Sequence, residues 1–371
     1  MNPTVELHCT DTVPGMLEGM HSLLEPNSID CIITSIPFGA LFMYSGKPED
    51  IGNNPDGADL RADRFALNMR FAVEGMYRVL KPGRVACIHI QQLRATQIQH
   101  GYIGRRNFMG AVVDLFTGPR RICACPACLQ PVTARYPHCG WCGSPLPFHE
   151  PQAPAQPYFE HVGEIAIRKN PQLVAKRETV HSLMFETGRR DACRLAPTCN
   201  DYVFFFRKPG ENKVPVRALY DPSRPQWNPG GWMSLDEWVC CAHGVWADIS
   251  ETDVLENWRG AREEGDEKHV CPQQLTTIRR CKNLYTNPGE TILDPFMGIG
   301  STAVVTVEPR TELRTGRELP GCNAVGFELK ESYHAKSLRY VAAALDGRLE
   351  RNDPRRGDLA LFDDSDARGA A

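Results

Sequence analysis

Residues 293–302 read LDPFMGIGST, and this stretch decides the fold. A short apolar run leads into a glycine turn, and a helix is expected over residues 301–307. Gly298 and Gly300 can adopt backbone angles that other residues avoid, which lets a ligand approach the main chain. The first turn of the following helix offers N–H groups that have no partner within the helix. The stretch therefore predicts a strand, a turn and a helix around a pocket of nucleotide size.

A second strand pattern supports this pocket. Residues 323–329 read NAVGFEL, with Glu328 near the end of the run. An acidic residue at this place binds ribose hydroxyls in nucleotide-binding α/β sheets. The third glycine of the dinucleotide fingerprint is absent, because Ser301 and Thr302 follow Gly300. The two strands predict an adenosine-type cofactor and argue against a plain dinucleotide-dependent dehydrogenase.

The glycine turn resembles the S-adenosylmethionine loop of the DNA amino-methyltransferases, which reads roughly D-P-F-x-G-x-G-[ST]-[ST]. Residues 287–291, NPGET, resemble the lead-in to that loop. Near the other end of the chain, residues 35–38 read SIPF and resemble the family's catalytic loop, [DNS]-P-P-[YF]. The apolar run at 28–34 predicts a buried strand in front of this loop. Both motifs of the family are therefore present in one chain.

The order of the segments also resembles this family. Helical spacing over residues 65–80 is followed by a turn at 81–84 and a strand at 85–90. Residues 201–209 resemble the last strand of the catalytic half, and residues 268–285 resemble the segment that leads into the cofactor strand. The catalytic loop precedes the cofactor loop, which is the permuted order called the beta class. The resemblance implies an α/β fold, a doubly wound, Rossmann-like methyltransferase sheet, with an inserted zinc ribbon and a small target-recognition region.

The resemblance also implies roles for individual residues. An exocyclic amine is a poor nucleophile because its lone pair is delocalised into the base, so the enzyme must accept hydrogen bonds from the NH2 group. The Ser35 hydroxyl and the Ile36 carbonyl are the expected acceptors, Pro37 stiffens the loop, and Phe38 stacks on a base that has been flipped out of the duplex. The residues expected at the S-adenosylmethionine site are Asp294, Pro295, Phe296, Gly298, Gly300, Ser301, Thr302, Glu328, Lys268 and Pro272.

The catalytic loop departs from the family pattern at two positions. Ile36 stands where the family has its first proline, and Ser35 stands where the adenine enzymes usually carry Asp or Asn. Serine is commoner in the cytosine-N4 enzymes, and the whole string resembles phage and prophage methyltransferases of unsettled or adenine specificity. Adenine N6 and cytosine N4 both stay open as the methylated position.

A different signal lies in the middle of the chain. Cys125, Cys128, Cys139 and Cys142 form two C-x-x-C pairs, the spacing of a zinc ribbon in which four thiolates hold a tetrahedral Zn²⁺ ion. Such a closed site folds a small module and leaves no coordination position for catalysis. Whether the ribbon also contacts DNA stays open. Three further residues lie near enough to be alternative ligands: Cys123, His138 and His149.

Disulfide bonds are the alternative for these cysteines. The sequence has no signal-peptide pattern and no apolar run long enough to span a bilayer, and its other cysteines are scattered. These features favour zinc binding in a reducing, cytoplasmic compartment of a bacterial or phage-encoded protein.

The overall charge bears on how DNA would bind. The formal net charge of the 371-residue chain is -3, so any DNA-binding groove must be local. The expected organisation is a catalytic half (1–117 and 158–213), a zinc-ribbon insertion (118–157), a target-recognition region (214–267), a cofactor-binding half (268–350) and a disordered tail (351–371).

Taken together, the sequence predicts a site-specific methyltransferase that acts on adenine N6 or cytosine N4 in double-stranded DNA. It is expected to use S-adenosylmethionine and structural Zn²⁺, to work as a monomer or homodimer without a membrane, and to protect or mark DNA as a stand-alone methylase. Two alternatives stay open: a methyltransferase that acts on RNA or a protein amide, and a catalytically inactive, zinc-containing DNA-binding protein.

Overall fold

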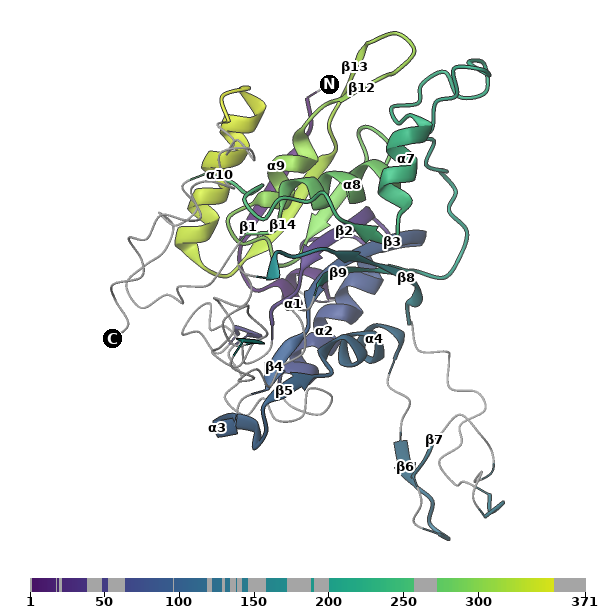
Figure 1. Cartoon of the computed structure of the whole chain (residues 1–371), viewed down its shortest axis with the longest axis vertical. Helices are drawn as coiled ribbons and strands as arrows, with labels where there is room; N and C mark the ends of the chain where they lie inside the picture. Colours follow the sequence, from purple (N-terminus) through teal and green to yellow (C-terminus); the bar gives the residue numbers. More distant parts are fainter. Residues whose placement is uncertain are drawn as a thin grey trace.

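The computed structural model describes residues 2–17, 19, 22–38, 49–52, 64–95, 97–118, 122–128, 131–133, 138, 142–145, 158–171, 188–189, 200–256 and 272–349. Eight strands form one large sheet in the order β1-β14-β11-β2-β3-β9-β8-β10 (Figure 1). These strands are β1 (Val5–Cys9), β2 (Ile29–Ser35), β3 (Leu80–Gln91), β8 (Glu160–Ile167), β9 (Asp201–Arg207), β10 (Val245–Trp246), β11 (Thr291–Asp294) and β14 (Asn323–Glu328).

The two halves of the chain meet in the middle of this sheet. Strand β11 pairs in parallel with β14 on one side and with β2 on the other, so Ile292 and Leu293 lie opposite Cys31 and Ile32. Strand β9 runs antiparallel to its neighbours β3 and β8, whereas every other neighbouring pair in the sheet is parallel. The parallel strands carry apolar side chains on both faces, as expected when helices cover both sides. The α/β prediction is confirmed.

Two apolar cores cover the two faces of the sheet. Along β2, Ile32 belongs to one core and its neighbours Cys31 and Ile33 belong to the other, because successive side chains of a strand point to opposite faces. Figure 1 shows the two sets of helices on opposite sides of the sheet. The first core packs α1 (Thr12–Met16), α2 (Arg64–Val79) and α4 (Phe108–Thr117), and the second packs α8 (Leu275–Tyr285), α9 (Ser301–Val307) and α10 (Glu331–Leu345).

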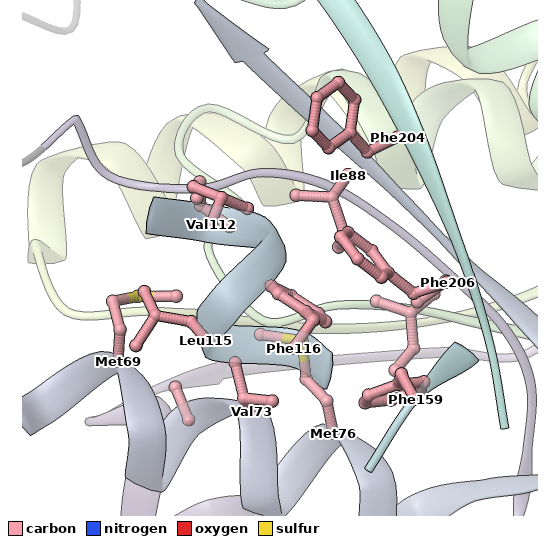
Figure 2. Close-up of a cluster of buried hydrophobic side chains, with 14 of the residues drawn as sticks. Met69, Val73, Met76, Ile88, Val112, Leu115, Phe116, Phe159, Phe204 and Phe206 are labelled. Carbon is pink, nitrogen blue, oxygen red and sulfur yellow. The ribbon is translucent and has the colours of Figure 1, made fainter. Parts of the chain in front are cut away.

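Figure 2 shows part of the first core. Helix α2 presents Met69, Val73 and Met76 at helical spacing, so all three lie on the face that packs against α4 and the sheet. The Phe116 ring of α4 stacks on the Phe206 ring of β9, with centroids 4.2 Å apart. This aromatic contact joins a helix of the catalytic half to a strand that follows the cysteine-rich segment.

Shorter elements lie around the sheet. Strands β4 (Leu93–Ala95) and β5 (Gly104–Arg106) form a hairpin around α3 (Gln97–His100), and β12 (Arg310–Thr311) pairs with β13 (Glu318–Leu319). Strands β6 (Ile122–Ala124) and β7 (Pro131–Thr133) pair with each other and lie apart from the large sheet (Figure 1). Across the part of the chain that is described, no helix has the length and apolarity needed to cross a bilayer.

The sequence predicts a turn at residues 81–84, whereas in the structure these residues lie within β3. The register of β2 with β3 jumps from Ile29↔Leu80 to Cys31↔Val85, so this segment forms a bulge. Gly83 has φ 75°, and a Cβ atom there would lie 2.3 Å from the Asn212 backbone nitrogen. The chain therefore bends at 81–84, as the sequence suggested, while β3 starts before the bend.

A buried ion-pair network lies beside this bulge and joins three strands. The Arg84 side chain is 2% exposed and forms salt bridges with Asp30 and Glu290, and its Nε donates to the Asp30 carbonyl oxygen at 2.9 Å. The Asp30 carboxylate also accepts from the Thr291 N–H at 3.0 Å and pairs with Lys81. The network connects β2 and β3 to the start of β11, which leads into the glycine turn.

The tryptophans at residues 214–256 fall into two groups. Trp246 lies on β10, is 1% exposed and donates from Nε1 to the Cys241 carbonyl at 3.0 Å. Trp232 donates from Nε1 to the Asn283 carbonyl in α8, and Arg310 lies over its ring. Trp227 is 72% exposed. Two tryptophans of the expected target-recognition region thus hold α7 (Leu235–Ala242) and β10 against the main fold.

Candidate active site

The carboxyl ends of β2, β11 and β14 lie along one edge of the sheet, where ligands bind in open α/β folds. The Thr34 hydroxyl, near the end of β2, donates to Asp294 Oδ1 at the end of β11 over 2.6 Å. The two residues are separated by 260 positions in the chain. This hydrogen bond brings the expected catalytic loop next to the expected cofactor turn.

The glycine turn has the backbone that the sequence predicted. Gly298 has φ 55° and Gly300 has φ 92°, both in the left-handed region that favours glycine. A Cβ atom at Gly300 would lie 2.7 Å from Ser337 Cβ on α10, whereas one at Gly298 would meet nothing within 4 Å. Gly300 therefore lets α10 approach closely, and Gly298 presents an open main-chain surface.

Glu328 closes the turn from the end of β14. Its Oε2 accepts from the Gly298 N–H and its Oε1 from the Lys330 N–H, each at 2.8 Å. The pKa of Glu328 is raised to about 7, chiefly by burial and in smaller part by the charges of Asp294 and Asp50, although the two backbone hydrogen bonds lower it. A carboxylate has about four acceptor positions, so this one can accept further hydrogen bonds from a ligand.

Asp294 is the second buried carboxyl group of the site. Burial raises its pKa to about 6, although hydrogen bonds from Thr302, Thr34 and the Phe296 N–H lower it. Asp50 is 7% exposed and contributes a third negative charge, which the sequence did not indicate. The charges of Asp294 and Asp50 oppose ionisation of Glu328, and such a group of acidic side chains favours a ligand that carries positive charge.

These raised pKa values make stability depend on pH. Glu328 titrates near 4.5 when unfolded and at about 7 when folded, so the folded state binds the extra proton over this interval. We therefore expect the free energy of unfolding of the free protein to fall as the pH rises from about 4.5 to about 7. Urea unfolding across this interval measures the effect. Glu328→Gln, which cannot titrate, should show a shallower decline, and an equally steep decline would contradict the assignment.

The side chains of the expected catalytic loop lie in different surroundings. Ser35 ends β2 with its Oγ 3.2 Å from His89 Nδ1. Ile36 is 1% exposed and belongs to the first core, so the residue that replaces the family's proline fills an apolar position. The Phe38 ring is 9% exposed and packs edge-on against Phe108, with centroids 6.2 Å apart. Most of the ring expected to stack on a base is thus buried in this conformation.

The remaining expected residues lie around the cofactor turn. Ser301 and Thr302 begin α9 and are buried, and Ser301 Oγ has no hydrogen-bond partner among the described residues. Phe296 is partly buried against the first core. Pro272 precedes α8, and the Thr276 N–H in the first turn of this helix donates to Asp253 Oδ2. Lys268 lies outside the described residues.

Three polar residues that belong to neither sequence motif lie behind Ser35. His89 on β3, Asp201 at the start of β9 and Lys169 after β8 form a contiguous polar cluster, with Asp201 between the other two. His89 interrupts an apolar strand and Asp201 opens another, which is a signal in the sequence, because charged groups in buried strands need a partner. Lys169 carries no comparable signal.

The cysteine-rich segment brings three sulfur atoms together. The thiol groups of Cys125, Cys128 and Cys142 all lie within 4.8 Å of one another, with Cys125 Sγ 3.7 Å from Cys142 Sγ. Cys139 lies outside the described residues, and His138 is exposed, with its backbone bridged to Pro145. Two cysteines of the first pair and one of the second therefore converge.

Comparison with known proteins agrees with the fold and the motifs. The profile of the N6_N4_Mtase family, described as DNA methylase, matches residues 29–339. Because the match spans most of the chain, the protein belongs to this DNA methylase family. It is 32% identical over 91 residues to the putative methylase YubD of Escherichia coli (strain K12), a stretch that covers 24% of this chain and 34% of that protein.

Solved structures show the same architecture. A putative DNA modification methylase from Thermus thermophilus, in complex with S-adenosyl-L-methionine, has a TM-score of 0.52 with 15% identity and covers 93% of this chain and 96% of its own. The selenomethionine derivative of that protein has a TM-score of 0.50 with 14% identity, over 93% and 97% of the two chains. At these identities the similarity is one of fold.

Proposed function

We propose that this protein transfers a methyl group from S-adenosylmethionine to adenine N6 or cytosine N4 of a base flipped out of double-stranded DNA. The observation that carries the proposal is the Thr34–Asp294 hydrogen bond, because it joins the strand that ends at Ser35 to the glycine turn that we expect to bind the cofactor. Membership of the DNA methylase family supports the reaction class, and the S-adenosyl-L-methionine complex of a protein with this fold supports the cofactor.

The residues around the glycine turn fit S-adenosylmethionine. This molecule supplies an electrophilic methyl group on a positively charged sulfonium. Glu328 has acceptor positions free for ribose hydroxyls, and the open main chain at Gly298 leaves room beside them. The negative charges of Asp294 and Asp50 favour the cationic methionine end. We expect Lys268 and Pro272 to border the same pocket.

The Ser35 loop would hold the target base. Its hydroxyl and the Ile36 carbonyl would accept hydrogen bonds from the exocyclic NH2 group, which localises the nitrogen lone pair for attack on the methyl carbon. Pro37 would hold the loop rigid, and the exposed part of Phe38 would contact the flipped base. Because Phe38 is packed against Phe108, we expect base binding to draw its ring further out of the core.

The direct test is transfer of a labelled methyl group to unmethylated duplex DNA, followed by mass spectrometry of the nucleosides. Label in N6-methyladenine or N4-methylcytosine supports the proposal and identifies the base. A protein that binds S-adenosylmethionine but labels only RNA or protein contradicts it in favour of another substrate. Binding of DNA without any transfer indicates an inactive DNA-binding protein. Protection of the product from restriction cleavage would test a modification role.

We also propose that the cysteine-rich segment binds one structural Zn²⁺ ion through Cys125, Cys128, Cys142 and Cys139. Tetrahedral Zn²⁺ with Zn–S bonds of about 2.3 Å needs sulfur atoms about 3.8 Å apart. The 3.7 Å between Cys125 and Cys142 fits this requirement. Four thiolates fill the coordination sphere, so the ion would stabilise the β6–β7 module and leave methyl transfer to the sheet.

Zinc content tests this assignment. We expect the purified protein to contain about one equivalent of zinc per chain, because a closed four-thiolate site binds one ion. Cys142→Ser should remove most of it, as measured by elemental analysis after dialysis. Cys240→Ser is the matched control, since Cys240 is an exposed cysteine on α7 and should keep the metal. Equal zinc in both variants would contradict the site.

A further inference from the structure

The buried cluster behind Ser35 connects four residues in a row. His89 lies opposite Ser35 in the β2–β3 register, with Nδ1 3.2 Å from Ser35 Oγ. Its Nε2 lies 3.3 Å from Asp201 Oδ2, and Lys169 Nζ lies 2.6 Å from the same oxygen. The side chains of His89, Asp201 and Lys169 are each less than a tenth exposed. A charged pair and a histidine are thus buried directly against the proposed amine acceptor.

The partners of His89 decide which ring nitrogen carries the proton. The Asp201 carboxylate can only accept, so the ring nitrogen facing it must donate. The 3.3 Å contact does not have full hydrogen-bond geometry, and the buried Nε2 has no hydrogen-bond partner among the described residues, but a proton on Nε2 is attracted by the Asp201 carboxylate whereas a lone pair there would be repelled by it. We therefore assign the proton of the neutral ring to Nε2, which leaves Nδ1 as an acceptor.

This tautomer determines what Ser35 can do. A serine hydroxyl can donate or accept, whereas an aspartate at the same position only accepts. If the Ser35 proton is donated to His89 Nδ1, the lone pairs of Oγ remain for the target amine. Without His89, the hydroxyl could donate to another group and lose the orientation that amine activation requires.

We propose that His89, oriented by Asp201 and Lys169, is a positioning residue that makes the Ser35 hydroxyl a hydrogen-bond acceptor for the target amine. The inference rests on the proposed function and deepens it.

The groups around His89 keep the Asp201 carboxylate ionised and the Cys87 thiol neutral. Burial alone would raise the pKa of Asp201, but the hydrogen bond from His89 and the charge of Lys169 hold it below its ordinary value, so the carboxylate stays ionised. Cys87 lies two residues before His89 on the same face of β3. Burial, with Cys281 of α8 and Cys31 of β2 beside it, raises the pKa of the Cys87 thiol well above its ordinary value and keeps it neutral.

The test measures single-turnover methyl transfer at saturating S-adenosylmethionine and DNA. His89→Phe should lower the rate by about 10-fold to 100-fold, the usual effect of losing a group that orients an active-site residue. His89→Asn should stay within about fivefold of the unsubstituted protein, because its carboxamide oxygen can replace Nδ1 at the loss of one hydrogen bond. S-adenosylmethionine affinity should change little in either variant.

His161→Asn is the matched control, since His161 of β8 lies beside Glu164 in the same sheet, and this variant should keep the rate. An unchanged rate in His89→Phe, or a loss in His89→Asn as large as that in His89→Phe, would overturn the proposal. Nitrogen NMR of the histidine rings gives a readout that does not need activity. An Nε2–H tautomer at His89 without methyl transfer would mean that the proposed function has failed. An Nδ1–H tautomer in an active enzyme would overturn this inference alone.

Discussion

Replacing Ser35 by alanine is expected to lower the single-turnover rate of methyl transfer by about 100-fold to 1,000-fold, the usual loss when one preorganised hydrogen-bonding group is removed from an active site. The reason is that the amine lone pair stays delocalised unless the NH2 group donates to an acceptor. Ser35 ends β2 beside Asp294, which its neighbour Thr34 contacts. Rapid-quench transfer of a labelled methyl group to duplex DNA measures the effect.

The Ser35 variant should bind S-adenosylmethionine with nearly unchanged affinity, because Glu328 and the glycine turn are not altered. Ser28→Ala is the matched control at the opposite end of the same strand, where the hydroxyl donates to the Glu25 carbonyl at 2.7 Å. That variant should transfer methyl groups at the normal rate. A Ser35→Ala protein with full activity would show that the acceptor for the amine lies elsewhere.

The largest expected effect on stability comes from Arg84. Arg84→Ala should lower the free energy of unfolding by about 3–5 kcal/mol, because it leaves the largely buried Glu290 carboxylate without a cation and the buried Asp30 carboxylate with Lys81 alone. Urea unfolding measures this change. Arg317→Ala removes an ion pair with Glu312 whose arginine is 69% exposed, and it should change stability by less than about 1 kcal/mol. Similar values for the two variants would contradict a special role for the buried network.

Local features of this protein were predictable because their physical causes are local. The glycine turn needs φ values that exclude most other residues, so Gly298 and Gly300 identify it without any tertiary information. Strand β2 and helix α9 follow from runs of apolar residues, and the acid at the end of β14 follows from its place after such a run. The two methyltransferase motifs and the family are therefore visible in the sequence.

Other features could not be read from the sequence, because a local pattern does not state what surrounds it. The turn at 81–84 is a bulge inside β3, since β9 and residues 211–212 pack beside it. Phe38 has the flat ring that base stacking needs, yet its neighbour Phe108, seventy positions away, buries most of it. Trp246 lies within the segment expected to recognise DNA, but it joins the core through β10, which pairs with β8.

The sequence by itself determined the strands, the turn chemistry, the family and the spacing of the cysteine pairs, because these depend on residues close together in the chain. Only the tertiary structure decided that β2 lies beside β11, which brings Ser35 to the cofactor turn across 260 positions. It also decided that His89, Asp201 and Lys169 from three separate segments form one buried cluster. Such contacts depend on strand pairing and register, which arise from the packing of both faces of the whole sheet.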